Sequence, residues 1–255
     1  MNSPPLQPLT ANLPVKVDTT RAAMGRRAAQ DIAAEIRARL SAQPKVRMVF
    51  AAAPSQLEML EVLALAADID WSRVEAFHMD EYIGLPAQAP QRFAQWLKRH
   101  FFDRVGITAL HLIEPGPDAQ TVAQDYAARL AEAPIDMVCL GIGTNGHLAF
   151  NDPPADLYDP LDVKVVTLDT ACRQQQVDDD CFDAIDLVPS QAITLTIPRL
   201  LRASRLFCVV PGQSKRAAVA EALHGPISGD CPASALRLHP DCTLYLDREA
   251  FPDVD

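Results

Sequence analysis

Buried strands and amphipathic helices alternate along this sequence, which restricts the chain to a small number of folds. Apolar residues recur every four positions through residues 18–40, and this spacing predicts an amphipathic helix. The runs at 46–54 and 135–143 are almost wholly apolar, as in strands that are buried on both faces. Strands that alternate with helices form a mostly parallel sheet with helices on both of its faces. We therefore expect an α/β fold of that kind.

The rest of the chain continues the same alternation. Further helices are expected at residues 93–102, 119–130 and 214–225, and further strands at 74–84, 163–169, 192–198, 205–212 and 242–247. No internal repeat and no polar linker divides the chain. We therefore expect a single domain over residues 18–255, preceded by an N-terminal extension of residues 1–17.

The charge of the chain narrows the range of partners. The 255 residues carry a formal net charge of -10, so the surface as a whole repels nucleic acid and anionic membranes. A few well-placed lysines or arginines can nevertheless bind one phosphate group. A small phosphorylated molecule therefore stays possible as a partner, whereas neither nucleic acid nor a membrane is expected.

Cysteine spacing and the N-terminal sequence indicate the compartment. None of the six cysteines lies in a C-x-x-C pair, and Cys139 and Cys208 fall within apolar runs that are predicted to be buried. This usage favours reduced thiols over a disulfide framework or a zinc site. The N-terminus lacks both regions of an export signal, and no apolar run has the length of a membrane span. We expect a soluble, cytoplasmic protein.

The stretch LGIGTNGHLAFNDPP, residues 140–154, fits two different kinds of site. Its glycines match G-x-G-x-x-G, the fingerprint of a dinucleotide-binding loop. That fingerprint needs a helix directly after the glycines to bind the pyrophosphate, and Pro153 and Pro154 prevent one here. The alternative is an active-site loop that presents His147, with Asp152 further on to orient its ring. On spacing alone, a structural histidine that caps a turn fits the pattern equally well.

Polar residues follow several of the predicted strands. Ser55, Asp80, Glu81 and His147 all come at the ends of such strands. In open parallel sheets, ligands bind beyond the carboxyl ends of the strands, where the strand order reverses. We therefore expect these residues at one edge of the sheet.

Two longer motifs make the sequence resemble a known family. FHMDEYIGLP, residues 77–86, and LGIGTNGHLAFNDP, residues 140–153, match in order and separation the glucosamine-6-phosphate deaminase (isomerase) family. Similarity continues through VPGQSKRAAVAEALHGPIS to LRLHPDCTLYLD, so it covers most of residues 18–247. The superfamily joins glucosamine- and galactosamine-6-phosphate isomerases with 6-phosphogluconolactonases, whose histidine loop typically lacks the F-N-[ED]-P tail. The resemblance implies a single three-layer, Rossmann-like domain.

The resemblance also implies an activity and catalytic residues. The family converts glucosamine 6-phosphate and water to fructose 6-phosphate and ammonia, without a metal or an organic cofactor. It assigns Asp80 as the base that moves a proton between C2 and C1, and His147 as the group that helps to open the pyranose ring. A carboxylate in a partly dry site has a raised pKa, which suits such a shuttle. Glu81 is expected either to orient groups in the site or to be structural.

Phosphate-binding residues are implied in the same way. Arg173 and Lys215 stand where the family places cations that contact the phosphate, and Lys215 falls in the first turn of a predicted helix, whose dipole favours an anion. Ser55, together with the helix that begins at Pro54, is expected to cradle the phosphate. Gly146 is expected to let the backbone of the histidine loop approach the substrate.

Three positions depart from the family's pattern. The phosphate loop usually has a glycine pair flanked by Ser or Thr, whereas this chain has Ala51, Ala52 and Ala53. Asn145 stands where Asp is common two residues before the histidine, and an amide cannot stabilise an imidazolium by charge. Asp152 replaces the longer Glu. We expect these departures to affect substrate affinity or sugar specificity more than proton transfer.

Alternatives stay open at this point. Galactosamine 6-phosphate is a substrate of the same class, because the motifs do not distinguish axial from equatorial hydroxyl groups. A 6-phosphogluconolactonase is disfavoured by AFNDPP. A non-catalytic sugar-phosphate sensor would normally carry a DNA-binding helix-turn-helix, which the short N-terminus and the acidic charge disfavour. Homo-oligomers are common among such enzymes, but nothing in the sequence fixes a number of subunits.

Overall fold

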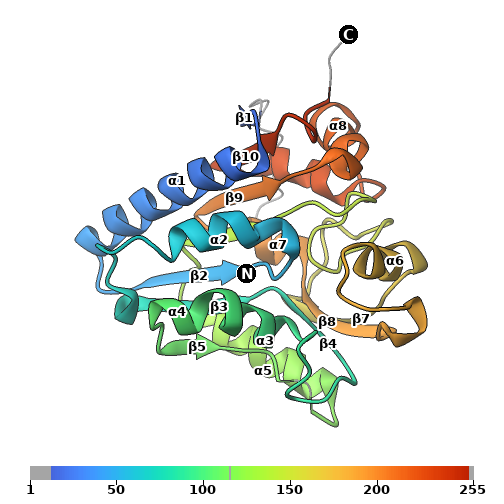
Figure 1. Ribbon diagram of the computed structural model, residues 1–255. Coiled ribbons are helices and arrows are strands. Elements are labelled where there is room, and N and C mark those ends of the chain that lie inside the picture. The colour runs from blue at the N-terminus through green and yellow to red at the C-terminus, as the bar shows by residue number, and fades with distance from the viewer. Residues whose placement is uncertain (1–12, 115, 253–255) are drawn as a thin grey trace.

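A computed structural model describes residues 13–114 and 116–252 and shows a central sheet between layers of helices (Figure 1). The strands are β1 (Val15–Asp18), β2 (Val46–Phe50), β3 (Val74–His78), β4 (Asp80–Tyr82), β5 (Ala109–His111), β6 (Met137–Leu140), β7 (Val163–Thr167), β8 (Gln191–Leu195), β9 (Arg205–Val210) and β10 (Cys242–Asp247). The α-helices are α1 (Arg21–Ala42), α2 (Leu57–Leu63), α3 (Phe93–Leu97), α4 (Asp103–Val105), α5 (Ala119–Ala131), α6 (Thr170–Asp178), α7 (Ile197–Leu201) and α8 (Arg216–His224), with π-helical residues Lys98–Phe102 between α3 and α4. Within the described ranges, no helix is both long and apolar enough to cross a membrane.

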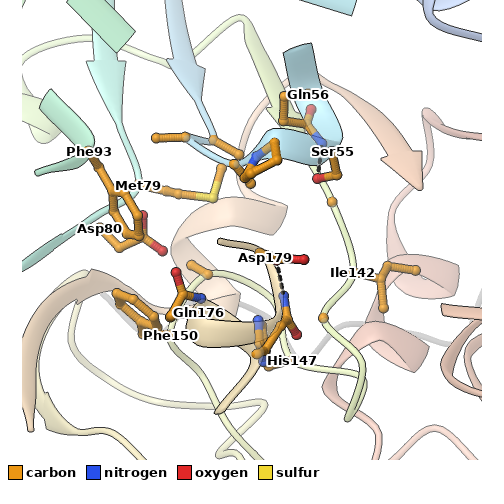
Figure 2. Close-up of a pocket in the computed structure, with 18 of the residues that line it drawn as sticks. Ser55, Gln56, Met79, Asp80, Phe93, Ile142, His147, Phe150, Gln176 and Asp179 are labelled. Carbon is orange, nitrogen blue, oxygen red and sulfur yellow. Dashed lines mark hydrogen bonds between the residues drawn. The ribbon is translucent and has the colours of Figure 1, made fainter. Parts of the chain in front are cut away.

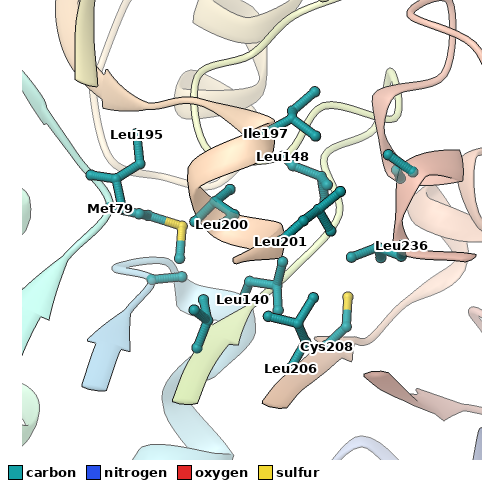
Figure 3. Close-up of a cluster of buried hydrophobic side chains, with 14 of the residues drawn as sticks. Met79, Leu140, Leu148, Leu195, Ile197, Leu200, Leu201, Leu206, Cys208 and Leu236 are labelled. Atoms are coloured by element: carbon teal, nitrogen blue, oxygen red, sulfur yellow. The ribbon is translucent and has the colours of Figure 1, made fainter. Parts of the chain in front are cut away.

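The expected parallel sheet is confirmed. Its strands pair in the order β1-β10-β9-β6-β2-β3-β5, and every neighbouring pair is parallel. Its central strands are buried on both faces, which explains why their sequences are mostly apolar. In β2, Met48 and Phe50 pack with α1 and α2, whereas Val49 faces α5 and α7. Figure 3 shows the second of these layers, in which Leu200 and Leu201 of α7 lie over β6 and β9.

One predicted strand is wrong, because the structure divides residues 74–84 at Met79. β3 belongs to the central sheet, whereas β4 joins a second, antiparallel sheet in the order β4-β8-β7. The Leu195 N–H donates to the Met79 carbonyl oxygen (2.8 Å), so the chain changes its pairing partner at this residue. The segments 163–169 and 192–198 likewise form the small antiparallel sheet and not part of the parallel one.

The N-terminal boundary also differs from the expectation. β1 pairs in parallel with β10, with Val15 opposite Leu244. The sheet therefore begins within residues 1–17, which were expected to form the extension, because β1 supplies its edge strand. Residues 1–12 of that extension lie outside the described residues.

The order of the strands opens a crevice beside β2. After β2 the chain adds β3 and β5 on one side, and then places β6, β9 and β10 on the other side. The loops that follow β2 and β6 therefore diverge at the carboxyl edge of the sheet. Ligand-binding crevices of open α/β sheets lie at such a point.

The contact between α1 and α2 generates a test of the fold. Gly25 of α1 is buried, and a Cβ atom there would lie 2.7 Å from Glu58 Cβ and 3.0 Å from the Met59 nitrogen. Gly25→Ala should therefore lower the free energy of unfolding by about 1–3 kcal/mol, although alanine is the better helix former. Gln30→Ala, at an exposed position of the same helix, should change it by less than about 0.5 kcal/mol. Urea unfolding measures both, and a stabilised Gly25→Ala would contradict this packing.

Candidate active site

Loops from parallel strands surround the crevice at the carboxyl edge of the sheet (Figure 2). Residues 51–56 follow β2, Met79 and Asp80 follow β3, residues from 141–150 follow β6, and Lys215 follows β9. The C-terminal part of α6 closes the remaining side. The crevice spans about 590 Å³, which includes space open to solvent.

Asp80 lies on one wall of the crevice, at the first residue of β4. Only 6% of its surface is exposed, and its carboxyl group makes no hydrogen bond to the residues that the structure describes. Burial raises the pKa of Asp80 well above its ordinary value, and the nearby charge of Glu81 raises it further. A carboxyl group with a raised pKa can accept a proton and return it near neutral pH. Asp80 is therefore placed to act as an acid–base group toward a ligand.

Glu81 does not line the crevice but holds the structure behind Asp80. Its carboxylate accepts hydrogen bonds from the N–H groups of Phe93 (3.1 Å) and Ala94 (3.0 Å) at the start of α3, and Arg92 lies 3.4 Å from it. Burial raises the pKa of Glu81 to about 7, against the effect of these partners. Of the two roles expected for Glu81, this geometry favours the structural one.

His147 lies across the crevice from Asp80 in Figure 2, on the loop after β6. Gly143 leaves the space for its ring, because a Cβ atom at Gly143 would fall 2.2–2.4 Å from the ring atoms. The Nδ1 atom of His147 lies 3.2 Å from Asp152 Oδ1, so the carboxylate stands beside the ring as expected. The other ring nitrogen has no partner among the described residues and can exchange a proton with a ligand.

Asn145 supports this pair without touching the imidazole ring. Its Nδ2 donates to Asp152 Oδ1 (3.1 Å), and its Oδ1 accepts from the His147 N–H (3.1 Å). Burial alone would raise the pKa of Asp152, but His147 and Asn145 outweigh it and hold that pKa below the ordinary value. An aspartate at position 145 would instead place a second negative charge beside Asp152. The two departures from the family's pattern in this loop are therefore in direct contact with each other.

Gly146 shapes the turn and does not line the crevice. Its φ is 85°, and a Cβ atom there would lie 3.0 Å from Cys231 Sγ. Residues 141–162, all of which the structure describes, contain no helix. The pyrophosphate site that a dinucleotide fingerprint requires is therefore missing from this stretch.

Lys215 is a cation that the structure brings into the crevice. It is 6% exposed, and its ammonium group makes no ion pair or hydrogen bond within the described part of the chain. Burial lowers its pKa, while the negative charge of Asp179 acts in the opposite direction. A buried ammonium group without a partner is costly, and an anionic ligand would pair it.

The loop after β2 offers few other groups to an anion. Ala51, Ala52 and Ala53 line the crevice together with Ser55. Gln56 Nε2 donates to Ser55 Oγ (3.2 Å), which fixes that hydroxyl group and leaves its hydrogen for a ligand. Ser55 is therefore placed where the sequence predicts it.

Arg173 is not brought into the crevice, in contrast to the expectation. Its guanidinium group donates to the carbonyl oxygens of Ile185 (2.7 Å) and Val188 (3.0 Å). Its neighbour Cys172 is buried, and successive side chains on a helix point about 100° apart. The inward position of Cys172 therefore directs Arg173 toward the turn at 185–188.

Helix α6 instead supplies residues that sequence reasoning missed. Gln175 and Gln176 line the crevice together with Asp179, the residue after the helix. The Tyr82 hydroxyl donates to Gln176 Oε1 (2.7 Å), and the Thr144 N–H donates to Gln175 Oε1 (2.9 Å). Three consecutive glutamines were the available signal, but the phase of the helix decides which of them face the crevice.

One cluster beside the crevice has the composition of a metal site. His147, Asp152 and Cys172 each place one ligand atom within 4.8 Å of the other two. The arrangement as a whole combines two proton-transfer groups, Asp80 and His147, with the unpaired ammonium group of Lys215. Such a crevice suits a small anionic substrate that undergoes proton transfer.

Comparison with known proteins extends this description. A family model described as Glucosamine-6-phosphate isomerases/6-phosphogluconolactonase matches residues 19–244. A glucosamine-6-phosphate deaminase of Halothermothrix orenii is 35% identical over 187 residues, which are 72% of this chain and 76% of that protein. The structure of a monomeric glucosamine-6-phosphate deaminase superposes with a TM-score of 0.86 at 28% identity, covering 93% of this chain and 98% of that one.

A more distant likeness reaches the lactonases. A 6-phosphogluconolactonase of Shewanella baltica superposes with a TM-score of 0.76 at 19% identity, covering 92% of this chain and 97% of that one, which shows the fold alone. The fold, the motifs and the match over residues 19–244 lead to one conclusion. This chain belongs to the glucosamine-6-phosphate isomerase/6-phosphogluconolactonase family.

Proposed function

We propose that this protein converts glucosamine 6-phosphate and water to fructose 6-phosphate and ammonia. The observation that carries the proposal is a buried carboxyl group with a raised pKa, Asp80, in one crevice with His147 and Lys215. The reaction needs acid–base groups at C1 and C2 of the sugar and a cation at its phosphate end. The named deaminases that this chain resembles support the same assignment.

His147 acts first in the proposed sequence. Isomerisation requires the open chain, so the bond between C1 and the ring oxygen must break. The free ring nitrogen of His147 takes the proton of the C1 hydroxyl group and returns one to the ring oxygen as the aldehyde forms. Asp152, at 3.2 Å from Nδ1, orients the imidazole and stabilises its charged form during this exchange.

Asp80 then moves a proton along the open chain. Its carboxylate removes the proton from C2 and returns it to C1, while O1 gains a proton and the amine nitrogen loses one, so that the aldehyde and the amine become an alcohol and an imine. Water hydrolyses the imine at C2 to the ketone and releases ammonia, so the atoms balance without a redox step. Burial supports this role because it raises the pKa of Asp80 and makes the carboxylate a stronger base.

Lys215 is proposed to bind the phosphate group, with the hydroxyl of Ser55. Within the described residues, Lys215 is the lone cation lining the crevice, and Asp179 lies in the same crevice. A single lysine beside a carboxylate neutralises a phosphate dianion only in part. We therefore expect a weaker affinity for the sugar phosphate than a site with two cations would give.

The setting of the reaction belongs to the proposal as well. All six cysteines are free and five of them are buried, which supports a reducing compartment such as the cytoplasm. The net charge of -10 disfavours nucleic acid as a partner. We also propose that the chain from β1 onward acts as a single domain, and a homo-oligomer stays a prediction.

The direct test is to incubate the purified protein with glucosamine 6-phosphate and to measure ammonia and fructose 6-phosphate in the same sample. Equal amounts of both products are expected, and His147→Ala should lose them because ring opening is impaired. Turnover of galactosamine 6-phosphate or hydrolysis of 6-phosphogluconolactone in their place would move the activity to that substrate. Binding of the sugar phosphates without any turnover would contradict the proposal that the protein is an enzyme.

Asp80→Asn tests the proposed base. An amide of the same shape cannot accept the C2 proton, so kcat should fall by about 10²–10⁴-fold while KM changes little. Asp179→Asn is the matched control, because Asp179 lines the same crevice and has no role in proton transfer. Steady-state kinetics separate the two variants. An equal loss of kcat in both would contradict the assignment of Asp80.

Lys215→Met tests the proposed phosphate contact. Loss of the ammonium group should raise KM by about tenfold or more with a smaller change in kcat, since one hydrogen bond to a charged group contributes about 1.5–3 kcal/mol. Arg173→Met is the comparison, because Arg173 donates to the carbonyl groups of Ile185 and Val188. A similar rise in KM for both variants would show that Arg173 reaches the phosphate in the complex.

A further inference from the structure

Two segments that are distant in sequence bring an imidazole, a carboxylate and a thiol together. His147 and Asp152 lie on the loop after β6, and Cys172 lies in the first turn of α6. One ligand atom of each residue lies within 4.8 Å of the other two. Cys172 is 1% exposed and forms no disulfide. His147 and Asp152 keep about a tenth of their side-chain surface exposed, so the cluster is shielded but reachable from the crevice.

Two buried polar atoms of this cluster make no regular hydrogen bond, although His147 Nδ1 lies beside the Asp152 carboxylate. His147 Nδ1 and Asp152 Oδ2 are buried and make no hydrogen bond within the described ranges. Buried polar atoms usually find a partner, and an unpaired one costs about 1–3 kcal/mol. Both atoms belong to side chains that take part in the cluster, so a bound cation would satisfy them together.

The nitrogen, oxygen and sulfur atoms of this cluster are the ligands that a borderline-soft divalent cation prefers. Nitrogen, oxygen and sulfur ligands at about 2.0–2.3 Å are typical of tetrahedral zinc sites, in which neighbouring ligand atoms are about 3.3–3.8 Å apart. His147 Nδ1 and Asp152 Oδ1 already lie 3.2 Å apart. Bringing Cys172 into the same geometry requires a movement of about 1 Å. The fourth position would be open to water or to a ligand in the crevice.

We propose that His147, Asp152 and Cys172 form a binding site for one zinc-like divalent cation, and that the bound cation inhibits the protein. Binding releases the thiol proton of Cys172 and converts it to a thiolate ligand. The cation separates Asp152 from the imidazole and binds Nδ1 of His147, so the other ring nitrogen stays protonated and no longer accepts a proton from the sugar. It also ties α6, which carries Gln175 and Gln176 into the crevice, to the histidine loop.

Metal binding is measured without any reference to activity. Metal-free protein is titrated with Zn²⁺ against a chromophoric chelator, and Co²⁺ is added separately to detect a thiolate-to-cobalt absorption band. The wild type should bind one equivalent of Zn²⁺ and show the band. Cys172→Ser should bind Zn²⁺ at least tenfold more weakly and lose the band, and Asp152→Asn should also bind more weakly.

Cys181→Ser is the matched control. Cys181 follows the same helix, is half-buried and belongs to no such cluster of the described residues. This variant should retain the affinity and the band of the wild type. Cys172→Ala, checked for folding by circular dichroism, separates loss of a ligand from loss of structure. Equal Zn²⁺ affinity in wild type and in folded Cys172 variants would overturn the site.

The inhibition rests on the proposed function and is measured second. Zn²⁺ should suppress deamination by the wild type, a chelator should restore it, and Cys172→Ser should resist the same Zn²⁺ concentration. Full activity with Zn²⁺ bound would overturn the inhibitory role and leave the site. A protein that binds Zn²⁺ through Cys172 but does not turn over glucosamine 6-phosphate would contradict the proposed function alone.

Discussion

The parallel pairing of β2 with β3 on one side and with β6 on the other is the interaction on which the site depends. It aligns the carboxyl ends of three strands, so that Ser55, Asp80 and His147 emerge at one edge of the sheet. The pairing is held in place because both faces of these strands are covered by apolar helices. Loops with little regular structure of their own thereby acquire fixed positions relative to one another.

The two neighbouring carboxyl groups of β4 show how the backbone assigns different tasks to similar residues. Successive side chains of a strand point to opposite faces, so Asp80 lines the crevice while Glu81 reaches the start of α3. Glu81 satisfies backbone N–H groups and fixes the strand, whereas the carboxyl group of Asp80 makes no hydrogen bond to the residues that the structure describes. The contacts of Glu81 therefore hold in place the strand that presents Asp80 as the reactive group.

Much of this architecture could be predicted from the sequence, because local patterns carry it. The parallel sheet follows from alternating apolar runs, and the positions of Asp80, His147 and Lys215 follow from long motifs. The division at Met79 could not be predicted, because the partner that causes it, Leu195, is distant in sequence. The position of the Arg173 side chain could not be predicted either, because it depends on which residues of α6 face the crevice.

The contact between Asn145 and Asp152 in the histidine loop could not be predicted from the sequence for a different reason. Asn145 and Asp152 are separate departures from a motif when they are read along the chain. Only the hydrogen bond between them shows that an amide and a shorter carboxylate form one unit.

The small antiparallel sheet has a consequence for synthesis on the ribosome. Asp80 pairs with Thr194, and β4 has no other strand partner in the described chain. A nascent chain that has emerged only as far as the histidine loop already contains Asp80 and His147. It still lacks β8, so it cannot hold Asp80 in place. The chemistry therefore becomes available only late in translation, after β8 has left the exit tunnel.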